Sequence, residues 1–259
     1  MSLLAIDVGN TNIVFGIFDG DALRVSWRLT TLSGRTVDEL WVLVSRLIAE
    51  RGVQPHDIDG VVLSSVVPPL TTTVSEMVKV GFNKTVLVVD AGNAGLPIRY
   101  ENPMEVGADR LVNGVAALEL YGQPPRPMVV VDFGTATTFD VISSSGEYCG
   151  GVICPGVDIS AEALFNRAAR LPMVAVRKPE ALIGRTTVSS MQSGLFYGYV
   201  AMVEGILDRL RREVQTEGEV WCVATGGLAD AVSSETTRID KVCNDLTLIG
   251  LRCVWEYNC

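Results

Sequence analysis

A short order of residues occurs twice in this chain, and its repetition limits the folds that the chain can form. Near the N-terminus an apolar run ends on Asp7, crosses a small polar turn and resumes as Ile13 to Phe18. The stretch from Met128 to Ile142 repeats this order, with Asp132 in the place of Asp7. Each copy predicts two strands joined by a tight turn, with a carboxylate at the end of the first strand.

The turn of the first copy carries groups that suit a phosphate. Gly9 lets the main chain approach a ligand closely, and the residues Asn10, Thr11 and Asn12 add amide, hydroxyl and main-chain donors. Asp7 beside such a turn suits a hydrated magnesium ion. One copy alone is typical of an ordinary hairpin. Because Gly134 and Thr135 repeat the turn, the pair favours two contacts with one polyphosphate.

Composition excludes several classes of protein. The chain has 259 residues, a mean hydropathy of +0.31 and a net charge of −9, so we expect a large core and no nucleic-acid partner. No apolar stretch approaches membrane-spanning length, and the N-terminus lacks the basic region of a signal peptide. We therefore expect a cytoplasmic protein without a membrane partner. The six cysteines form no CxxC pair, which predicts free thiols.

Common catalytic and nucleotide-binding motifs are missing from the sequence. The single histidine, His56, lies in a polar loop, which disfavours a Ser-His-Asp triad and a histidine metal site. Neither GxxxxGK[ST] nor GxGxxG occurs, so the P-loop and Rossmann folds lack their fingerprints. A nucleotide would therefore have to bind through a different motif.

The remaining pattern predicts an α/β protein with mixed sheets flanked by helices, in two related domains. A linker at 122–127 separates a domain at 1–122, with the first hairpin, from a domain at 123–259, with the second. Further strands are expected at 22–30, 60–67, 85–89, 148–152 and 220–225. Helices are expected from Thr36, through Met77, after Glu105, and at 159–169, 189–214 and 246–257.

Two further stretches carry candidate chemistry. Asp109 would lie in the first turn of a helix after a glycine-rich loop, where it could accept a proton from a hydroxyl while Arg110 holds an anion. The alternative is that Asp109 caps the helix and Arg110 forms a surface ion pair. Gly226 and Gly227, between a strand and a helix, would let a flat ring approach the main chain as an adenosine contact.

Taken together, these motifs resemble the type III pantothenate kinases, within the superfamily of actin, Hsp70 and the sugar kinases. The resemblance spans nearly the whole chain and is carried, in the order of the family, by DVGNTN, GADR, DFGTATT, GRTTVSSMQSG and ATGG. It implies ATP-dependent phosphorylation of pantothenate, the first step of coenzyme A biosynthesis. It also implies two actin-like domains with ATP between them, a homodimer, and a need for Mg²⁺ and a monovalent cation, K⁺ or NH₄⁺.

The resemblance assigns roles to individual residues. Asp109 matches the catalytic base, and Asp132 matches the ligand of the monovalent cation. The nucleotide-binding residues it implies are Asp7, Val8, Gly9, Asn10, Thr11, Asn12, Ile13, Val14 and Thr135. The pantothenate contacts it implies are Tyr100, Gly107, Ala108, Arg110 and Thr187. The family usually carries Lys-Asn-Thr where this chain has Arg185-Thr186-Thr187, so the threonine is retained.

Two other functions stay open at this point. A kinase of the same superfamily that acts on another small hydroxylated acid would share the phosphate hairpins, without GADR together with Tyr100 and Thr187. An accessory protein that binds nucleotide without turnover would be free to lose Asp7, Asp109 and Asp132, all of which are present.

Overall fold

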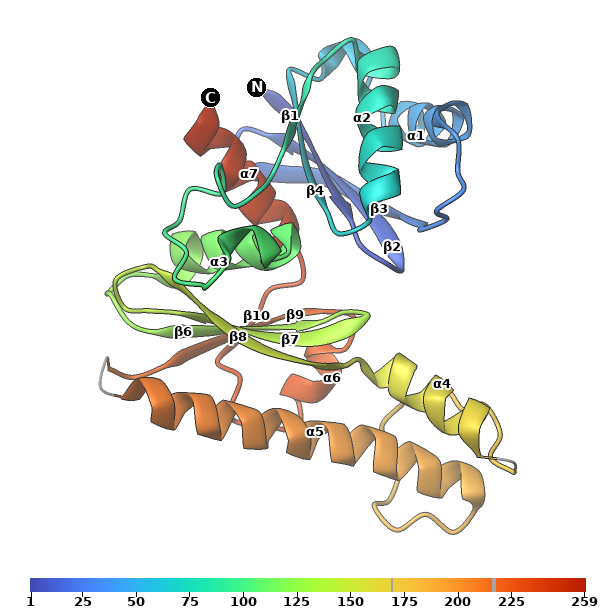
Figure 1. The fold of residues 1–259 in the computed structure, drawn as a ribbon. Coiled ribbons are helices and arrows are strands. Elements are labelled where there is room, and N and C mark those ends of the chain that lie inside the picture. Colours follow the sequence, from blue (N-terminus) through green and yellow to red (C-terminus); the bar gives the residue numbers. More distant parts are fainter. Residues whose placement is uncertain (169, 216–217) are drawn as a thin grey trace. The chain divides into compact units, whose positions relative to one another are not determined.

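The computed structural model describes residues 1–168, 170–215 and 218–259, and it divides the chain into two compact units (Figure 1). One unit comprises Met1–Leu120 and Asp245–Cys259, and the other comprises Tyr121–Asn244. Each unit is built on a five-stranded mixed sheet flanked by helices, which confirms the predicted fold class. Within the described residues, no helix is long and apolar enough to cross a membrane.

The first sheet contains the first predicted hairpin. Its strand order is β3-β2-β1-β4-β5. Strand β1 pairs antiparallel with β2 on one side and parallel with β4 on the other, so β2 begins and β4 ends beside the carboxyl end of β1. The bounds are β1 Ser2–Val8, β2 Asn12–Asp19, β3 Ala22–Thr30, β4 Gly60–Ser65 and β5 Val86–Val88.

Helices cover this sheet and close its core. The apolar stripe of α1 and the inner side of α2 pack on the face that carries Leu4, Ile6 and Val8. The capping box predicted at Thr36 forms, because Thr36 N–H donates to Glu39 Oε2 and Glu39 N–H donates to Thr36 Oγ1. The helices are α1 Val37–Glu50, α2 Pro68–Phe82, α3 Ala108–Tyr121 and α7 Leu246–Asn258, with single 3₁₀ turns at Pro55–Asp57 and Pro103–Glu105.

The C-terminal helix α7 belongs to the first unit, which differs from the predicted boundary at 123–259. Arg252 Nη1 lies 2.8 Å from Asp21 Oδ1, and Thr247 Oγ1 donates to Asn113 Oδ1 at 2.8 Å. A Cβ atom at Gly250 would lie 1.9 Å from the carbonyl oxygen of Val112, so the helix needs glycine at this close approach to α3. These contacts join residues that are far apart in the sequence, so no local sequence pattern predicts them.

The second sheet repeats the arrangement of the first. Its order is β10-β9-β6-β7-β8, and β6 pairs antiparallel with β7 and parallel with β9, as β1 does with β2 and β4. The repeated sequence motif therefore forms the same arrangement of strands in both sheets. The bounds are β6 Met128–Phe133, β7 Ala136–Ile142, β8 Tyr148–Pro155, β9 Trp221–Gly226 and β10 Lys241–Val242, with helices α4 Val157–Arg167, α5 Thr187–Val214 and α6 Ala229–Ser233. Ala169, at the predicted end of the helix at 159–169, lies outside the described residues.

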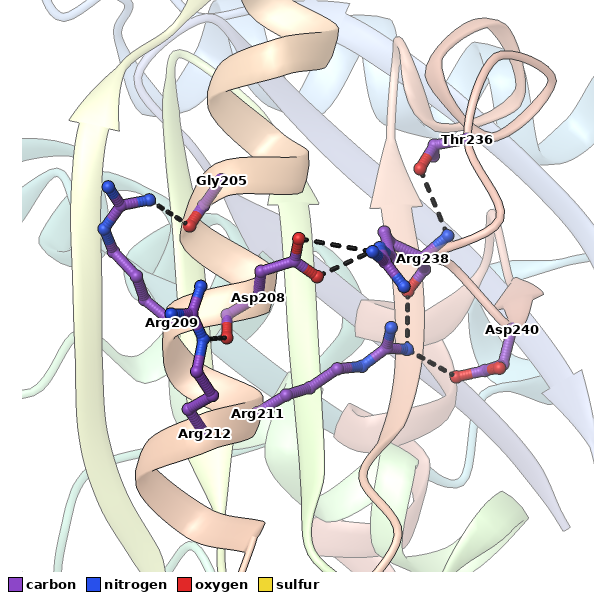
Figure 2. A network of polar contacts seen from close by, with 8 residues as sticks. All are labelled: Gly205, Asp208, Arg209, Arg211, Arg212, Thr236, Arg238 and Asp240. Carbon is purple, nitrogen blue, oxygen red and sulfur yellow. Dashed lines mark hydrogen bonds and ion pairs between the residues drawn. The ribbon is translucent and has the colours of Figure 1, made fainter.

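Arginine side chains tie the long helix α5 to the segment before β10 (Figure 2). Arg238 Nε lies 2.9 Å from Asp208 Oδ1, and Arg211 donates to the carbonyl oxygen of Arg238 at 2.9 Å. The carboxylate of Asp240 accepts the N–H of Cys222 at 2.7 Å, at the start of β9. The network therefore fixes the strand that leads into Gly226 and Gly227.

Candidate active site

The β1–β2 turn is held in shape by the residue that follows β3. Gly9 N–H donates to the carbonyl oxygen of Asn12 at 3.0 Å, which closes the turn. Thr31 Oγ1 donates to Gly9 O at 2.7 Å, and Thr31 N–H donates to Thr11 O at 2.9 Å. The sequence did not predict Thr31, because its role depends on β3 returning beside the turn. Asn10 and Thr11 are exposed at the tip, where their donors can meet a ligand.

The other residues of the predicted nucleotide loop belong to the strands. Val8 and Ile13 are completely buried in the core and pair with each other across the β1–β2 ladder, so they support the turn from the two strands. Asn12 and Val14 are half-buried at the start of β2. Asp7 is half-buried at the penultimate position of β1, so its carboxylate lies at the carboxyl end of the strand.

Asp109 occupies the second position of α3 and depends on a glycine before it. Its Oδ1 accepts the N–H of Arg110 at 2.8 Å. A Cβ atom built at Gly107 would lie 2.5 Å from this oxygen and 3.5 Å from Val66 Cγ1. Gly107 therefore leaves the space that the Asp109 carboxylate occupies, a reason that the GADR motif alone does not reveal.

Val66 connects Asp109 to the phosphate turn. It follows β4, and its N–H donates to the carbonyl oxygen of Val8 at 3.0 Å. Val8 is the last residue of β1, and Gly107 lies against the Val66 side chain. The start of α3 therefore lies at the sheet edge that carries Asp7 and the β1–β2 turn. The sequence predicted these as two separate candidates, and the fold brings them together.

Burial changes the acidity of the Asp109 carboxyl. Desolvation raises its pKa above the ordinary value, against the lowering effect of the Arg110 N–H and of the Arg110 charge. A carboxylate with a raised pKa is a stronger base, and Asp109 is only partly buried by its surface exposure. The position therefore suits a proton acceptor.

The surface ion pair considered for Arg110 is wrong, because its side chain is only 8% exposed. Ala108 is also buried, which leaves its main chain as the group that a ligand can contact. Tyr100 lies in the loop before Pro103–Glu105 and is 41% exposed, so its ring is accessible. The predicted pantothenate contacts of this unit are therefore of two kinds: the exposed ring of Tyr100 and the buried residues at the start of α3.

In the second unit, the predicted residues gather at the carboxyl end of β6. Gly227 N–H donates to the carbonyl oxygen of Phe133 at 3.1 Å. Gly226 has φ +92°, and a Cβ atom there would lie 2.6 Å from the same oxygen. The Gly-Gly turn therefore lies directly against the turn that contains Gly134 and Thr135.

A third glycine supports this turn and was not predicted as part of the site. A Cβ atom at Gly156 would lie 2.2 Å from Thr135 O and 2.8 Å from Gly134 O. The end of β8 can therefore approach the turn only because residue 156 has no side chain.

Asp132 shares one face of the second sheet with Thr138. Thr138 is its register partner on β7, and paired residues carry their side chains to the same face of the sheet. Thr138 Oγ1 donates its proton to Asp140 Oδ2 at 2.9 Å, so the hydroxyl lone pairs remain for a cation. Tyr148 donates to the other oxygen of the buried Asp140 at 2.8 Å, which fixes that carboxylate. Carboxylate and hydroxyl oxygens fit an alkali metal ion.

Thr187 lies apart from these residues in the second unit. It is the first residue of α5, is exposed, and follows the capping residue Thr186. It lines an open cavity of about 930 Å³, together with Leu164 of α4 and Met191 of α5. This cavity is a separate feature of the unit, lined also by Leu171, Gly184, Arg185, Thr186, Ser190, Gly194 and Leu195.

Comparison with known proteins identifies the family. The family model described as type III pantothenate kinase matches residues 3–209. The chain belongs to the type III pantothenate kinase family. It is 51% identical to the type III pantothenate kinase of Moorella thermoacetica and 47% identical to that of Halalkalibacterium halodurans, in each case over 257 residues and 99% of both chains.

A solved structure outside the pantothenate kinases shares the fold. The activator of the 2-hydroxyisocaproyl-CoA dehydratase from Clostridium difficile, with bound ADPNP, superposes with a TM-score of 0.56. The match covers 100% of this chain and 95% of the other, at 10% sequence identity. This similarity shows that a protein of distant sequence shares the fold, and it carries no information on function.

Replacement of Asp109 by asparagine should stabilise the protein in a pH-dependent manner. Because burial raises the carboxyl pKa, the charged form costs free energy in the folded state above that pKa. The cost falls as the pH drops through the raised pKa, and it is lost below the ordinary value of about 3.9, where the group is protonated in both states. Thermal unfolding of Asp109→Asn should therefore occur above that of the wild type at pH 8, with a smaller difference at pH 4. An equal difference at both values would contradict the pKa shift.

Proposed function

We propose that the chain transfers the γ-phosphoryl group of ATP directly to the primary hydroxyl of pantothenate. One observation carries this proposal: Gly107 and Val66 hold Asp109 at the sheet edge that carries the β1–β2 turn. A proton acceptor and a phosphate-binding turn at one edge are the two parts that transfer to an alcohol requires. Membership of the family supplies the substrate.

In the proposed reaction Asp109 accepts the proton of the attacking hydroxyl. Its raised pKa makes it a better base than an exposed carboxylate. Main-chain donors from Asn10 to Asn12 and from Gly134 to Thr135 bind the triphosphate, and Gly9 lets the main chain approach it closely. Gly226 and Gly227 admit the adenosine. Phosphoryl transfer needs positioning and charge stabilisation, and a covalent intermediate is not required.

The substrate and the cations complete the proposal. Tyr100, Gly107, Ala108, Arg110 and Thr187 contact pantothenate, and Arg110 offsets its negative charge. Magnesium supplies positive charge to the phosphates, and Asp7 holds it through water. Asp132 binds the monovalent cation, K⁺ or NH₄⁺, and the oxygen atoms of Thr138 and Asp140 beside it support this role.

We also propose a cytoplasmic homodimer. Helix α4 and the segment before α5 in the second unit carry exposed apolar side chains. They are 37–80% exposed, which is typical of an interface, and include Ile159, Leu164, Phe165, Met173, Leu182 and Ile183. Light scattering should give twice the chain mass of 27.8 kDa, and a mass of one chain would contradict the dimer.

The test of the proposed function is the release of ADP from ATP and magnesium, with and without pantothenate. We expect pantothenate-dependent ADP formation, and a loss of roughly 10²–10⁴ in kcat for Asp109→Asn, because the variant keeps the shape and loses the base. Wild-type turnover in this variant would exclude Asp109 as the base. Nucleotide binding without turnover on pantothenate would leave another hydroxylated acid, or a binding protein, as the explanation.

The role of Asp132 is tested by replacing potassium with sodium in the same assay. The wild type should need potassium, and Asp132→Asn should lose this response because the cation loses its charged ligand. Asp57→Asn removes the same charge from an exposed loop and serves as the control. A potassium response that survives in Asp132→Asn would place the ion elsewhere.

A further inference from the structure

Ser64 is a buried hydroxyl residue beside Asp7. The two residues are register partners on the parallel strands β4 and β1, so their side chains lie on the same face of the sheet. Ser64 is 0% exposed. Among the described residues, its Oγ has no hydrogen-bond partner.

A hydroxyl in this position is costly unless something binds it. Burial removes it from bulk water, and a buried polar group without a partner costs free energy. Alanine would fill nearly the same space without this cost, so packing alone does not explain the serine. Ser65 differs: its Oγ accepts the N–H of Val67 at 3.2 Å and the hydroxyl of Thr71 at 2.7 Å.

The second sheet repeats the pairing of a carboxylate with a hydroxyl. Thr225 is the register partner of Asp132 on the parallel strands β9 and β6, and it is 2% exposed. Both Asp-x-Gly turns therefore have a buried hydroxyl residue directly beside the carboxylate, on the neighbouring parallel strand. The repetition in two sheets of different sequence is an observation independent of the missing partner at Ser64.

The chemistry at Asp7 indicates what the hydroxyl binds. A carboxylate offers only acceptors, and a water bound to a divalent cation is a strong donor. Such a water can donate one hydrogen to Asp7 and the other to Ser64 Oγ, and these two side chains lie on one face of adjacent strands.

We infer that Ser64 is a positioning residue of the magnesium site at Asp7. Its Oγ accepts a hydrogen bond from a water of the metal shell that Asp7 also binds. This inference rests on the proposed function, because it assigns a residue to the magnesium of that reaction.

The test compares Ser64→Ala with the wild type over a range of magnesium concentrations. Loss of one such hydrogen bond should raise the half-saturating magnesium concentration about 3- to 30-fold. The KM for pantothenate should stay within about twofold, since Ser64 does not contact that substrate. The same magnesium shift should appear when binding of a non-hydrolysable ATP analogue is measured by calorimetry, which needs no turnover.

Two variants separate this role from packing. Ser64→Thr keeps the hydroxyl, and Thr225 occupies the equivalent position in the second sheet, so this variant should retain the wild-type magnesium dependence. Ser65→Ala, on the opposite face, removes the hydrogen bonds of Ser65 and should lower the unfolding temperature. It should leave the magnesium dependence unchanged. If Ser64→Ala does not fold, Ser64→Cys removes the hydroxyl at similar volume.

The inference would be overturned if Ser64→Ala or Ser64→Cys kept the wild-type magnesium dependence, whether it is measured by turnover or by analogue binding. Absence of pantothenate-dependent turnover in the wild type would overturn the proposed function instead. The two failures are therefore distinguishable, because analogue binding reports on Ser64 in either case.

Discussion

The pairing of β1 with two different neighbours is the constraint on which the first unit depends. An antiparallel partner joined by a tight turn places Gly9 directly after the strand, and a parallel partner places Ser64 and Val66 beside its end. Because all of these meet at the carboxyl end of β1, the Asp7 carboxylate, the turn and the start of α3 share one edge. Strand β6 reproduces the pairing with β7 and β9, which explains why the second unit carries an equivalent turn.

The buried carboxyl of Asp109 lowers the stability of the fold and raises the basicity of the group. Burial of Asp109 raises its pKa, so the charged form opposes folding while it becomes more basic. Gly107 is part of the same arrangement, since a Cβ atom would displace the carboxylate. The inference about Ser64 has the same form, because a buried hydroxyl without a partner costs free energy and a hydrogen bond to a bound ligand offsets that cost.

The sequence predicts features that local patterns encode. The two hairpins, the capping box at Thr36 and the long helix α5 follow from turn residues and apolar spacing, and the structure contains all three. The sequence could not predict features that depend on distant contacts. Helix α7 joins the first unit through Arg252 and Gly250, and Thr31 supports the phosphate turn only because β3 returns to it. Gly107 was assigned to the substrate site from the family motif. The physical need for glycine there is visible only once the position of the Asp109 carboxylate is known.

The proposed function requires that both Asp-x-Gly turns bind the phosphates of one ATP. Backbone amide chemical shifts of Gly9 to Asn12 and of Gly134 to Thr135 test it, as a non-hydrolysable ATP analogue is added with magnesium. We predict that both sets of amides shift with the same half-saturating concentration of the analogue. A response confined to one turn, or two different concentrations, would contradict the claim.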